Sequence, residues 1–240
     1  MTSGLDLEEC CALIGESAGV VFRALDGLGH EAVRFWTGAS DAGSLPAAAD
    51  TDVLESAIMA ELTSSVVPMN GCGVVFAPGL IRDRDLIMQW FRHDSHGRIR
   101  RLSLDFNPSS ERFYDYTRMG WFRVPRDEGR PTIVGPYVDI HGSDFYVMTF
   151  AIPLTSNGRF LGIAGADLAL VEVERELTSP LRGLDVEALL ITEEGRILAA
   201  NTPSWIPGNL MPRNPDRPIR EAKVPNTSAE WKVVLLGDTM

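Results

Sequence analysis

The chain has 240 residues, of which 45% are hydrophobic, and its 33 Asp and Glu against 22 Lys and Arg give a formal net charge of −11. This composition suits one large or two small domains with an ample core, and it is far from that of a disordered chain. Nucleic acids and anionic lipids need a basic protein face, so the acidic balance argues against both as primary partners.

The cysteines and the N-terminal segment bear on the compartment. The chain has only three cysteines, two of them adjacent at Cys10 and Cys11, which cannot form a disulfide framework and fit a reduced compartment. Acidic residues stand near the N-terminus, where a signal peptide would carry Lys or Arg. No window approaches the roughly 18 apolar residues of a membrane-spanning helix. We therefore predict a soluble, cytoplasmic chain with no membrane partner, or a soluble domain excised from a longer protein.

A long helix is predicted at the N-terminus. Ser3 and Asp6 resemble a capping box, and apolar residues follow at helical spacing from Leu7 to Leu28 and on towards Trp36. At about 1.5 Å per residue this helix would span on the order of 45 Å, which is more than one small core needs. We expect it to be a spine along two modules or a dimer interface, followed by a loop and a second helix over residues 52–65.

The middle of the chain has the pattern of an antiparallel sheet. Five segments have the residue content of strands, namely residues 71–78, 86–92, 99–106, 144–154 and 160–170. Ser156–Gly158 is a Ser-Asn-Gly turn that predicts a hairpin between the last two strands. Strands that follow one another through hairpins pair antiparallel. A helix that begins at Val171 and a break over residues 180–185 end this part of the chain.

The C-terminal part has the pattern of a second, smaller sheet. Residues 186–201 read as two strands around a turn, and a Pro-rich stretch precedes a last strand over 230–237. We predict an α+β fold with a long N-terminal helix and two antiparallel-sheet modules. The expected divisions are a spine helix and loop at 1–50, a module with the ligand pocket at 51–178, and a smaller module at 179–240.

The candidate site lies between Phe113 and Leu168. Aromatic residues and carboxylates recur there at strand-connecting positions of an otherwise apolar pattern, namely Tyr114, Trp121, Tyr137, Asp139 and Asp167. Asp is depleted in strands, and a buried carboxylate has to be paired or hydrogen-bonded. Aromatic faces and fixed carboxylates together stabilise a desolvated ammonium group. The pattern therefore predicts a pocket for a small organic cation.

The sequence contains no recognisable catalytic or cofactor motif. It has no G-x-S-x-G, and its GIAGAD run lacks the spacing of a dinucleotide or P-loop fingerprint. His93 and His96 stand in a turn-like context without further ligands nearby, so we expect no metal site. Two buried carboxylates could divide acid and base roles in a hydrolytic or transfer enzyme, but no substrate-binding signature accompanies them. We predict a protein that is not an enzyme and needs no cofactor.

The order of the elements and the candidate residues resemble the double Cache family, the PAS-like sensor domains of bacterial receptors. The resemblance implies a long N-terminal helix, a distal module that binds ligand, and a smaller proximal module that closes on a W-x-V-V strand, here residues 231–234. Family members usually lie outside the cell between two membrane helices. Receptor dimers pack along the long helix, which implies a homodimer through the face that carries Val21 and Leu25.

The family's ligand pattern matches this chain position by position. Members that bind amino acids or amines carry Tyr, a Trp seven positions later, Tyr-x-Asp after a Gly/Pro turn, and Asp at a strand end. Tyr114, Trp121, Tyr137, Asp139 and Asp167 stand at these positions. The resemblance implies that the two Asp accept hydrogen bonds from a ligand ammonium, that Trp121 and Tyr137 supply π-faces, and that Tyr114 adds a wall.

Two departures from the family pattern bear on the ligand class. Amino-acid binders carry an Arg two residues before the Trp to hold the ligand carboxylate, and here that position is Met119, with Arg118 beside it. A shift of one residue on an extended segment turns a side chain to the opposite face. The residue after the Trp is usually Tyr and is Phe122 here. The resemblance therefore implies an amine ligand, with an amino-acid sensor that uses Arg118 as a displaced clamp, or a dimerisation scaffold without ligand, as alternatives.

Overall fold

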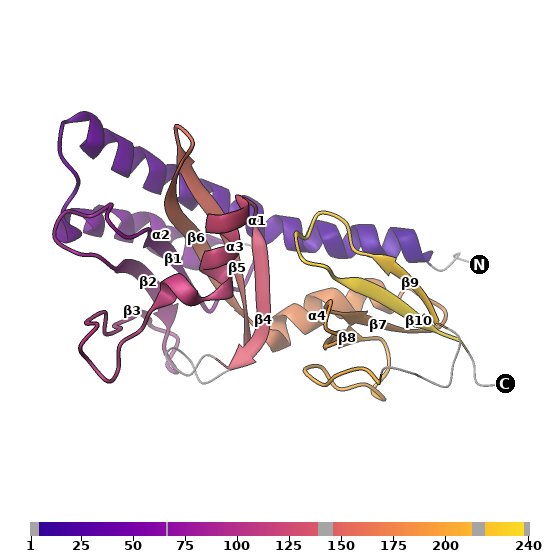
Figure 1. The fold of residues 1–240 in the computed structure, drawn as a ribbon. Coiled ribbons are helices and arrows are strands. Elements are labelled where there is room, and N and C mark those ends of the chain that lie inside the picture. The colour runs from indigo at the N-terminus through magenta and orange to yellow at the C-terminus, as the bar shows by residue number, and fades with distance from the viewer. Residues whose placement is uncertain (1–4, 66, 139–145, 213–218, 238–240) are drawn as a thin grey trace. The chain divides into compact units, whose positions relative to one another are not determined.

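The computed structural model describes residues 5–65, 67–138, 146–212 and 219–237, and the chain divides into two compact units. The larger unit comprises residues 21–169, and the smaller unit joins residues 1–20 to residues 170–240. Helix α1 (Leu7–Asp41) contributes to both units (Figure 1). The predicted α+β fold, with its long N-terminal helix and two antiparallel sheets, is confirmed. The two units divide the chain after residues 20 and 169, whereas the divisions expected from the sequence fall after residues 50 and 178.

The larger unit is built on a six-stranded antiparallel sheet with the strand order β3-β2-β1-β6-β5-β4. The strands are β1 (Gly71–Phe76), β2 (Ile87–His93), β3 (Ile99–Arg101), β4 (Thr132–Val138), β5 (Tyr146–Ser156) and β6 (Arg159–Ala169). The strand expected over 99–106 ends early, at Arg101, and the other four predicted strands are confirmed. At the β5–β6 hairpin Asn157 and Gly158 have φ angles of 50° and 75°, the left-handed backbone of a tight hairpin turn, so this prediction is also confirmed.

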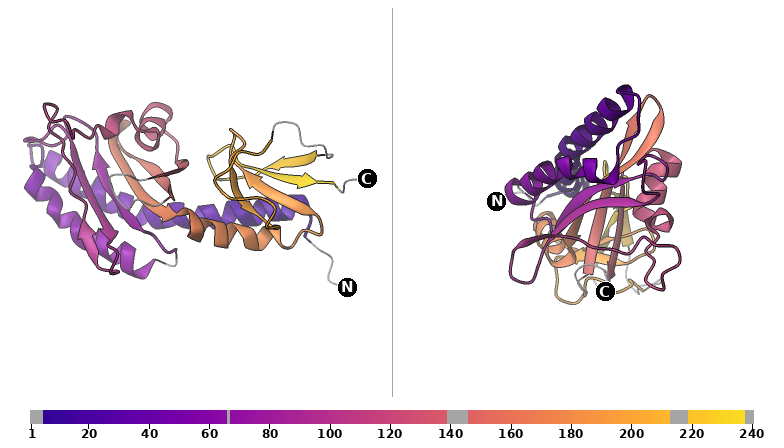
Figure 2. Two further views of the ribbon diagram at one scale, coloured as in Figure 1. Left: turned by 90° about the horizontal axis from the view of Figure 1, so that it is seen from below. Right: turned by 90° about the vertical axis from the view of Figure 1, so that its left-hand side faces the viewer.

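Helices α1 and α2 (Glu55–Ser64), with the 3-10 helix η1 (Ala48–Leu54), cover one face of this sheet (Figure 2). Phe22 of α1 packs edge-on against Phe150 of β5, with 5.5 Å between the ring centroids. Gly29 lets the helix come close to the sheet, because a Cβ atom there would lie only 3.0 Å from Leu154 Cδ2. The predicted helix from Leu7 towards Trp36 is confirmed, and it continues to Asp41.

The apolar stripe of α1 is covered by the chain itself. Val21 and Leu25, which the sequence placed at a dimer interface, are only 3% and 0% exposed. The sequence analysis expected self-association because the stripe is longer than one module can bury. In the structure α1 belongs to both units, and the stripe is buried along its length. A homodimer stays a prediction, and these two side chains are not available to form it.

The opposite face of the sheet carries α3 (Gly120–Glu128), the 3-10 helix η2 (Tyr116–Arg118) and the loop over residues 102–115. The sequence analysis placed Trp121 at a strand-connecting position and expected no helix there, so α3 is a correction. A nine-residue helix that begins with Gly and contains Pro125 has little intrinsic helix propensity, and tertiary packing stabilises such helices. Burial of Trp121 and Phe122, at 6% and 0% exposed, provides that packing.

The smaller unit holds a four-stranded antiparallel sheet with the order β8-β7-β10-β9 and the helix α4 (Leu170–Leu181). Its strands are β7 (Glu187–Ile191), β8 (Ile197–Ala200), β9 (Ile219–Lys223) and β10 (Lys232–Leu236). The first part of α1 packs closely on this unit, since a Cβ atom on Gly15 would lie 2.3 Å from the Pro225 carbonyl oxygen. The sequence analysis missed β9, which lies in the Pro-rich stretch, and it expected the strands that became β7, β8 and β10.

Candidate functional site

A small cavity opens on the α3 face of the larger unit. Its walls come from β2, the 102–115 loop, α3, β4, β5 and β6, and the lining residues are Met88, Trp90, Leu102, Leu104, Tyr114, Trp121, Tyr137, Thr149 and Asp167. The cavity has a volume of about 20 Å³ and is partly open to solvent. A space of this size has room for about one water molecule or a group of similar size.

The strand register explains why Trp90 and Asp167 face the same space. Trp90 lies opposite Gly73 on β1, and Gly73 lies opposite Gly165 on β6, two residues before Asp167. A Cβ atom on Gly165 would lie 3.2 Å from the Trp90 ring atom Cη2, so the glycine leaves the space that the indole occupies. Residues two apart on a strand face the same side of the sheet, so Asp167 lies on the same face as Trp90 and close to it.

Three polar side chains form a continuous hydrogen-bond chain at the end of the cavity. Thr149 lies opposite Asp167 in the β5–β6 register and donates its hydroxyl proton to Asp167 Oδ1 over 2.6 Å. The Tyr137 hydroxyl oxygen lies 2.5 Å from the Thr149 hydroxyl oxygen. Tyr137 can reach it because Tyr137 pairs with Val147, two residues from Thr149 along β5. Thr149 is 2% exposed, so the centre of this hydrogen-bond chain is shielded from solvent.

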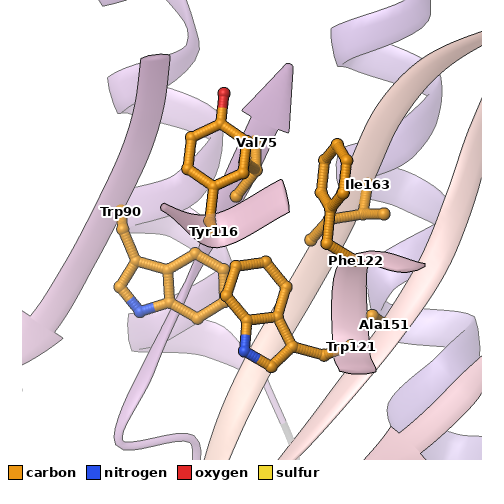
Figure 3. Close-up of a cluster of buried hydrophobic side chains, with 7 residues drawn as sticks. All are labelled: Val75, Trp90, Tyr116, Trp121, Phe122, Ala151 and Ile163. Atoms are coloured by element: carbon orange, nitrogen blue, oxygen red, sulfur yellow. The ribbon is translucent and has the colours of Figure 1, made fainter. Parts of the chain in front are cut away.

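A buried aromatic cluster packs beside the cavity. Trp90, Trp121, Tyr116 and Phe122 belong to one buried cluster, in which the Trp90 indole comes from β2 and the Trp121 indole from α3 (Figure 3). The Tyr116 ring centroid is 6.5 Å from that of Trp121 and 5.2 Å from that of Phe122. Phe122 is fully buried, so the hydroxyl of the tyrosine usual in the family would have to find a partner inside this cluster.

Tyr114 and Tyr116 have different surroundings. Tyr116 is 0% exposed, and its hydroxyl donates to the Phe76 carbonyl oxygen over 2.7 Å and accepts from the Ile87 N–H over 3.1 Å. Burial raises the pKa of the Tyr116 phenol above its ordinary value. Tyr116 is therefore part of the core, whereas Tyr114 is half-buried and lines the cavity.

The structure brings four of the six residues expected from the sequence around one cavity: Tyr114, Trp121, Tyr137 and Asp167. Arg118 is exposed on η2 and does not line this cavity, and Met119 is half-buried against the aromatic cluster. Met119 has an extended backbone while Arg118 lies in a 3-10 turn, so the two are not successive residues of one extended segment. Asp139 lies outside the described residues, and its role stays a prediction.

Sequence reasoning missed five lining residues: Met88, Trp90, Leu102, Leu104 and Thr149. Met88 and Trp90 alternate along a strand that the sequence predicted, so they could have been proposed as one face of it. Thr149 was visible only as a polar residue in the apolar run of β5. Among the described residues no group of three or more His, Cys, Asp or Glu could hold a metal ion, and no described helix is long and apolar enough to cross a membrane.

One protein-family model matches half of the chain. Residues 56–175 match the family model described as methyl-accepting chemotaxis protein-like, first PDC sensor domain. A curated relative, the methyl-accepting chemotaxis protein PscA of Pseudomonas syringae pv. tomato (strain ATCC BAA-871 / DC3000), is 31% identical over 85 residues. That alignment covers 35% of this chain and 13% of PscA, so it spans a small part of a much longer protein.

Solved structures show the same fold at low sequence identity. The extracellular domain of mmHK1S-Z3 has a TM-score of 0.68 at 14% identity, with 96% of this chain and 91% of that chain covered. The ligand-binding domain of the amino acid chemoreceptor PctB of Pseudomonas aeruginosa PAO1, in complex with L-Arg, has a TM-score of 0.55 at 17% identity and coverages of 94% and 89%. That of the Pseudomonas fluorescens chemoreceptor CtaA, in complex with L-valine, has a TM-score of 0.56 at 14% identity and coverages of 98% and 96%. Because the mmHK1S-Z3 domain is extracellular, these comparisons lend no support to the cytoplasmic location expected from the sequence.

Proposed function

Because the chain belongs to the family of methyl-accepting chemotaxis protein-like PDC sensor domains, we propose that it senses a small organic amine in the cavity of the larger unit. The observation that carries this proposal is the position of Asp167. It is the only charged residue among the described residues that line the cavity, and Tyr114, Trp121 and Tyr137 line the same space. These four side chains come from the 102–115 loop, helix α3 and the strands β4 and β6.

The physical chemistry of this lining favours a cation. A half-buried carboxylate attracts an ammonium group more strongly than it would in bulk water, because the surrounding dielectric constant is lower. The aromatic walls add the attraction of a cation to a π-face. Asp139, predicted as a second acceptor for the ammonium, would strengthen the same preference.

The same lining disfavours a ligand carboxylate. No Lys or Arg is among the described residues that line the cavity, and Met119 packs on the aromatic cluster where amino-acid binders of the family carry an Arg. A free α-carboxylate would therefore meet Asp167 without a matched cation, and such like-charge contacts cost several kcal/mol. Amines should bind more tightly than their α-amino-acid counterparts.

An amino-acid sensor is the second candidate. PctB and CtaA, which share the fold, are described in complex with L-Arg and L-valine. For this chain to hold an α-carboxylate with Arg118, that exposed side chain would have to move from η2 into the cavity. Trp90 and Trp121 line the cavity and carry indole N–H donors, which are the other groups that a carboxylate could use.

Calorimetric titration with matched ligand pairs decides between these candidates. Butylamine and L-norvaline, or ethylamine and L-alanine, differ by an α-carboxylate, and each pair is titrated into the same preparation. The amine sensor predicts that the amine binds at least about tenfold more tightly, which corresponds to about 1.4 kcal/mol. Tighter binding of the amino acids would overturn it in favour of the second candidate, and mass spectrometry of the recovered ligand checks that no turnover occurs. Titration of an Asp139→Asn variant tests the predicted role of Asp139.

A further inference from the structure

The smaller unit carries a groove of about 530 Å³ that shares no lining residue with the cavity of the larger unit. One wall is α4, and the other is the segment over residues 200–205 at the end of β8, which packs beside α4 (Figure 1). Pockets for small molecules usually measure about 300–1,000 Å³. The groove therefore has room for a small organic ligand, although it is open to solvent on one side.

The two walls of the groove are fastened to each other. The Asn201 side chain donates to the Leu181 carbonyl oxygen at the end of α4 over 3.1 Å and accepts from the Ala188 N–H over 2.8 Å. Trp205, on the same wall as Asn201, packs on the core cluster of the smaller sheet and donates its indole N–H to Glu187 Oε1 over 2.8 Å. The groove is therefore formed by the fold itself and does not need a ligand to shape it.

Thr178 offers this groove a hydroxyl that its own helix does not use. Threonines inside helices can donate to the carbonyl oxygen four residues earlier, and Thr37 and Thr63 of this chain do so over 2.8 Å each. Thr178 lines the groove and is 7% exposed, yet its hydroxyl has no hydrogen-bond partner among the described residues. A polar group in so buried a side chain costs free energy unless it is hydrogen-bonded. A polar group of a ligand in the groove would supply the missing partner.

Charges of both signs line the groove on α4. Arg175 is neutralised within the helix, because its Nη2 lies 2.5 Å from Glu172 Oε2. Glu174 and Arg182 have no ion-pair partner in the part of the chain that the structure describes. Arg182 directly follows α4, and its N–H still bonds to the Thr178 carbonyl oxygen. Glu174 and Arg182 are thus separated by about 12 Å of helix, with Thr178 midway between them.

We propose that this groove binds a short peptide, with Arg182 on the ligand carboxylate, Glu174 on the ligand ammonium and Thr178 on the peptide bond between them. An extended dipeptide spans about 7 Å, and an ion-pair contact of about 3 Å at each end extends its reach to about 13 Å. This reach matches the separation along α4, whereas an α-amino acid carries both charges on one carbon. The groove is a second site, and it does not depend on amine sensing in the larger unit.

NMR titration of the full chain with glycylglycine locates the site. The indole N–H resonance of Trp205 reports on the groove, and those of Trp90 and Trp121 report on the cavity of the larger unit. A Trp205→Phe variant assigns the first resonance. That resonance should shift to saturation with the same Kd in the wild type and in Asp167→Asn, which alters only the cavity of the larger unit. A Trp205 resonance that does not shift, or a Kd that changes in Asp167→Asn, would overturn the second site.

Blocked peptides and two isomers test the charged ends. N-acetylglycylglycine lacks the ammonium and glycylglycinamide lacks the carboxylate, so each should bind at least about threefold more weakly than glycylglycine. δ-Aminovalerate should bind more tightly than its isomer L-norvaline, in which the same two charges share one carbon. Equal binding of the blocked peptides, or tighter binding of L-norvaline at the Trp205 resonance, would overturn the assignment of a ligand with two separated charges.

Variants on α4 test the two charged residues. Glu174→Gln and Arg182→Gln each remove one charge and should weaken glycylglycine binding by at least about threefold. The matched control is Glu176→Gln, because Glu176 is exposed on the same helix and does not line the groove. The control should keep the wild-type Kd. Wild-type binding in both groove variants would overturn their roles.

Thr178→Val keeps the shape of the side chain and removes the hydroxyl. Because the hydroxyl has no partner among the described residues, the variant should be at least as stable as the wild type in urea. The wild type should prefer glycylglycine over δ-aminovalerate, a chain of equal length in which two methylene groups replace the peptide bond, by at least about threefold. Thr178→Val should lose this preference. A folded Thr178→Val variant with the wild-type preference would overturn the assignment of a peptide.

Discussion

Asp167→Asn keeps the shape of the side chain and removes its charge, so it isolates the electrostatic part of ligand binding. Two unit charges about 4 Å apart attract by about 4 kcal/mol at an effective dielectric constant of about 20. Asp167 is half-buried, so solvent screens part of this attraction, and the asparagine oxygen still accepts one hydrogen bond from the ligand. We therefore expect a loss of about 2–3 kcal/mol in the free energy of binding, which is about 30- to 150-fold in the Kd of an amine.

The assay is calorimetric titration of propylamine into the wild-type chain and into two variants. Asn can still accept the Thr149 hydroxyl, so the Asp167→Asn variant should unfold within about 1 kcal/mol of the wild type. The matched control is Asp127→Asn, because Asp127 is exposed on α3 and pairs with Arg126 rather than with the cavity. The control should keep wild-type affinity. An Asp167→Asn variant that folds and binds propylamine as tightly as the wild type would refute the assignment of Asp167 to the ammonium.

Four further predictions concern the core, the long helix and the exposed arginine. Tyr116→Phe removes two buried hydrogen bonds to backbone groups and should lower the free energy of unfolding by about 1–3 kcal/mol in urea denaturation. Leu25→Glu puts a charge at a position that is 0% exposed, so it should lower the free energy of unfolding by more than about 3 kcal/mol. A variant that keeps its fold and changes from dimer to monomer in sedimentation would contradict the observed packing of Leu25. Arg118→Ala should leave the Kd of propylamine within about twofold of the wild-type value, because Arg118 is exposed and does not line the cavity. A large loss of L-norvaline binding in the same variant would support the amino-acid sensor instead. Burial raises the pKa of the Cys10 thiol from 9.0 to about 12, so this thiol ionises at a lower pH in the unfolded chain than in the folded one. The urea midpoint of unfolding should therefore fall as the pH rises above about 9. Alkylation of Cys10 at pH 8 should be slow until the chain unfolds.

Local signals in the sequence were enough for most of the fold. The helical spacing from Leu7 towards Trp36 and the Asn157-Gly158 turn are short-range patterns, and both features are present in the structure. Where local propensity is weak, as in α3 with its leading Gly and its internal Pro125, the sequence alone did not indicate the helix. Burial of Trp121 stabilises that helix, and burial is a property of the tertiary structure.

For the candidate site, spacing within the sequence identified Tyr114, Trp121, Tyr137 and Asp167, which the structure brings around one cavity. It did not identify Thr149.

The tight turn pairs Ser156 with Arg159 and Thr155 with Phe160, and a regular hairpin continued from there would set Thr149 opposite Ala166. A bulge between Leu154 and Thr155 shifts the pairing by one residue, so that Thr149 lies opposite Asp167. Gly162, with a φ of 139°, sits in this bulge, and a Cβ atom there would lie 2.0 Å from the Val75 carbonyl oxygen on the neighbouring strand. A slip of one residue turns every side chain to the other face of the sheet. The types of residue in the site were thus readable from the sequence, whereas the contact between Thr149 and Asp167 was decided by how β6 packs against β1.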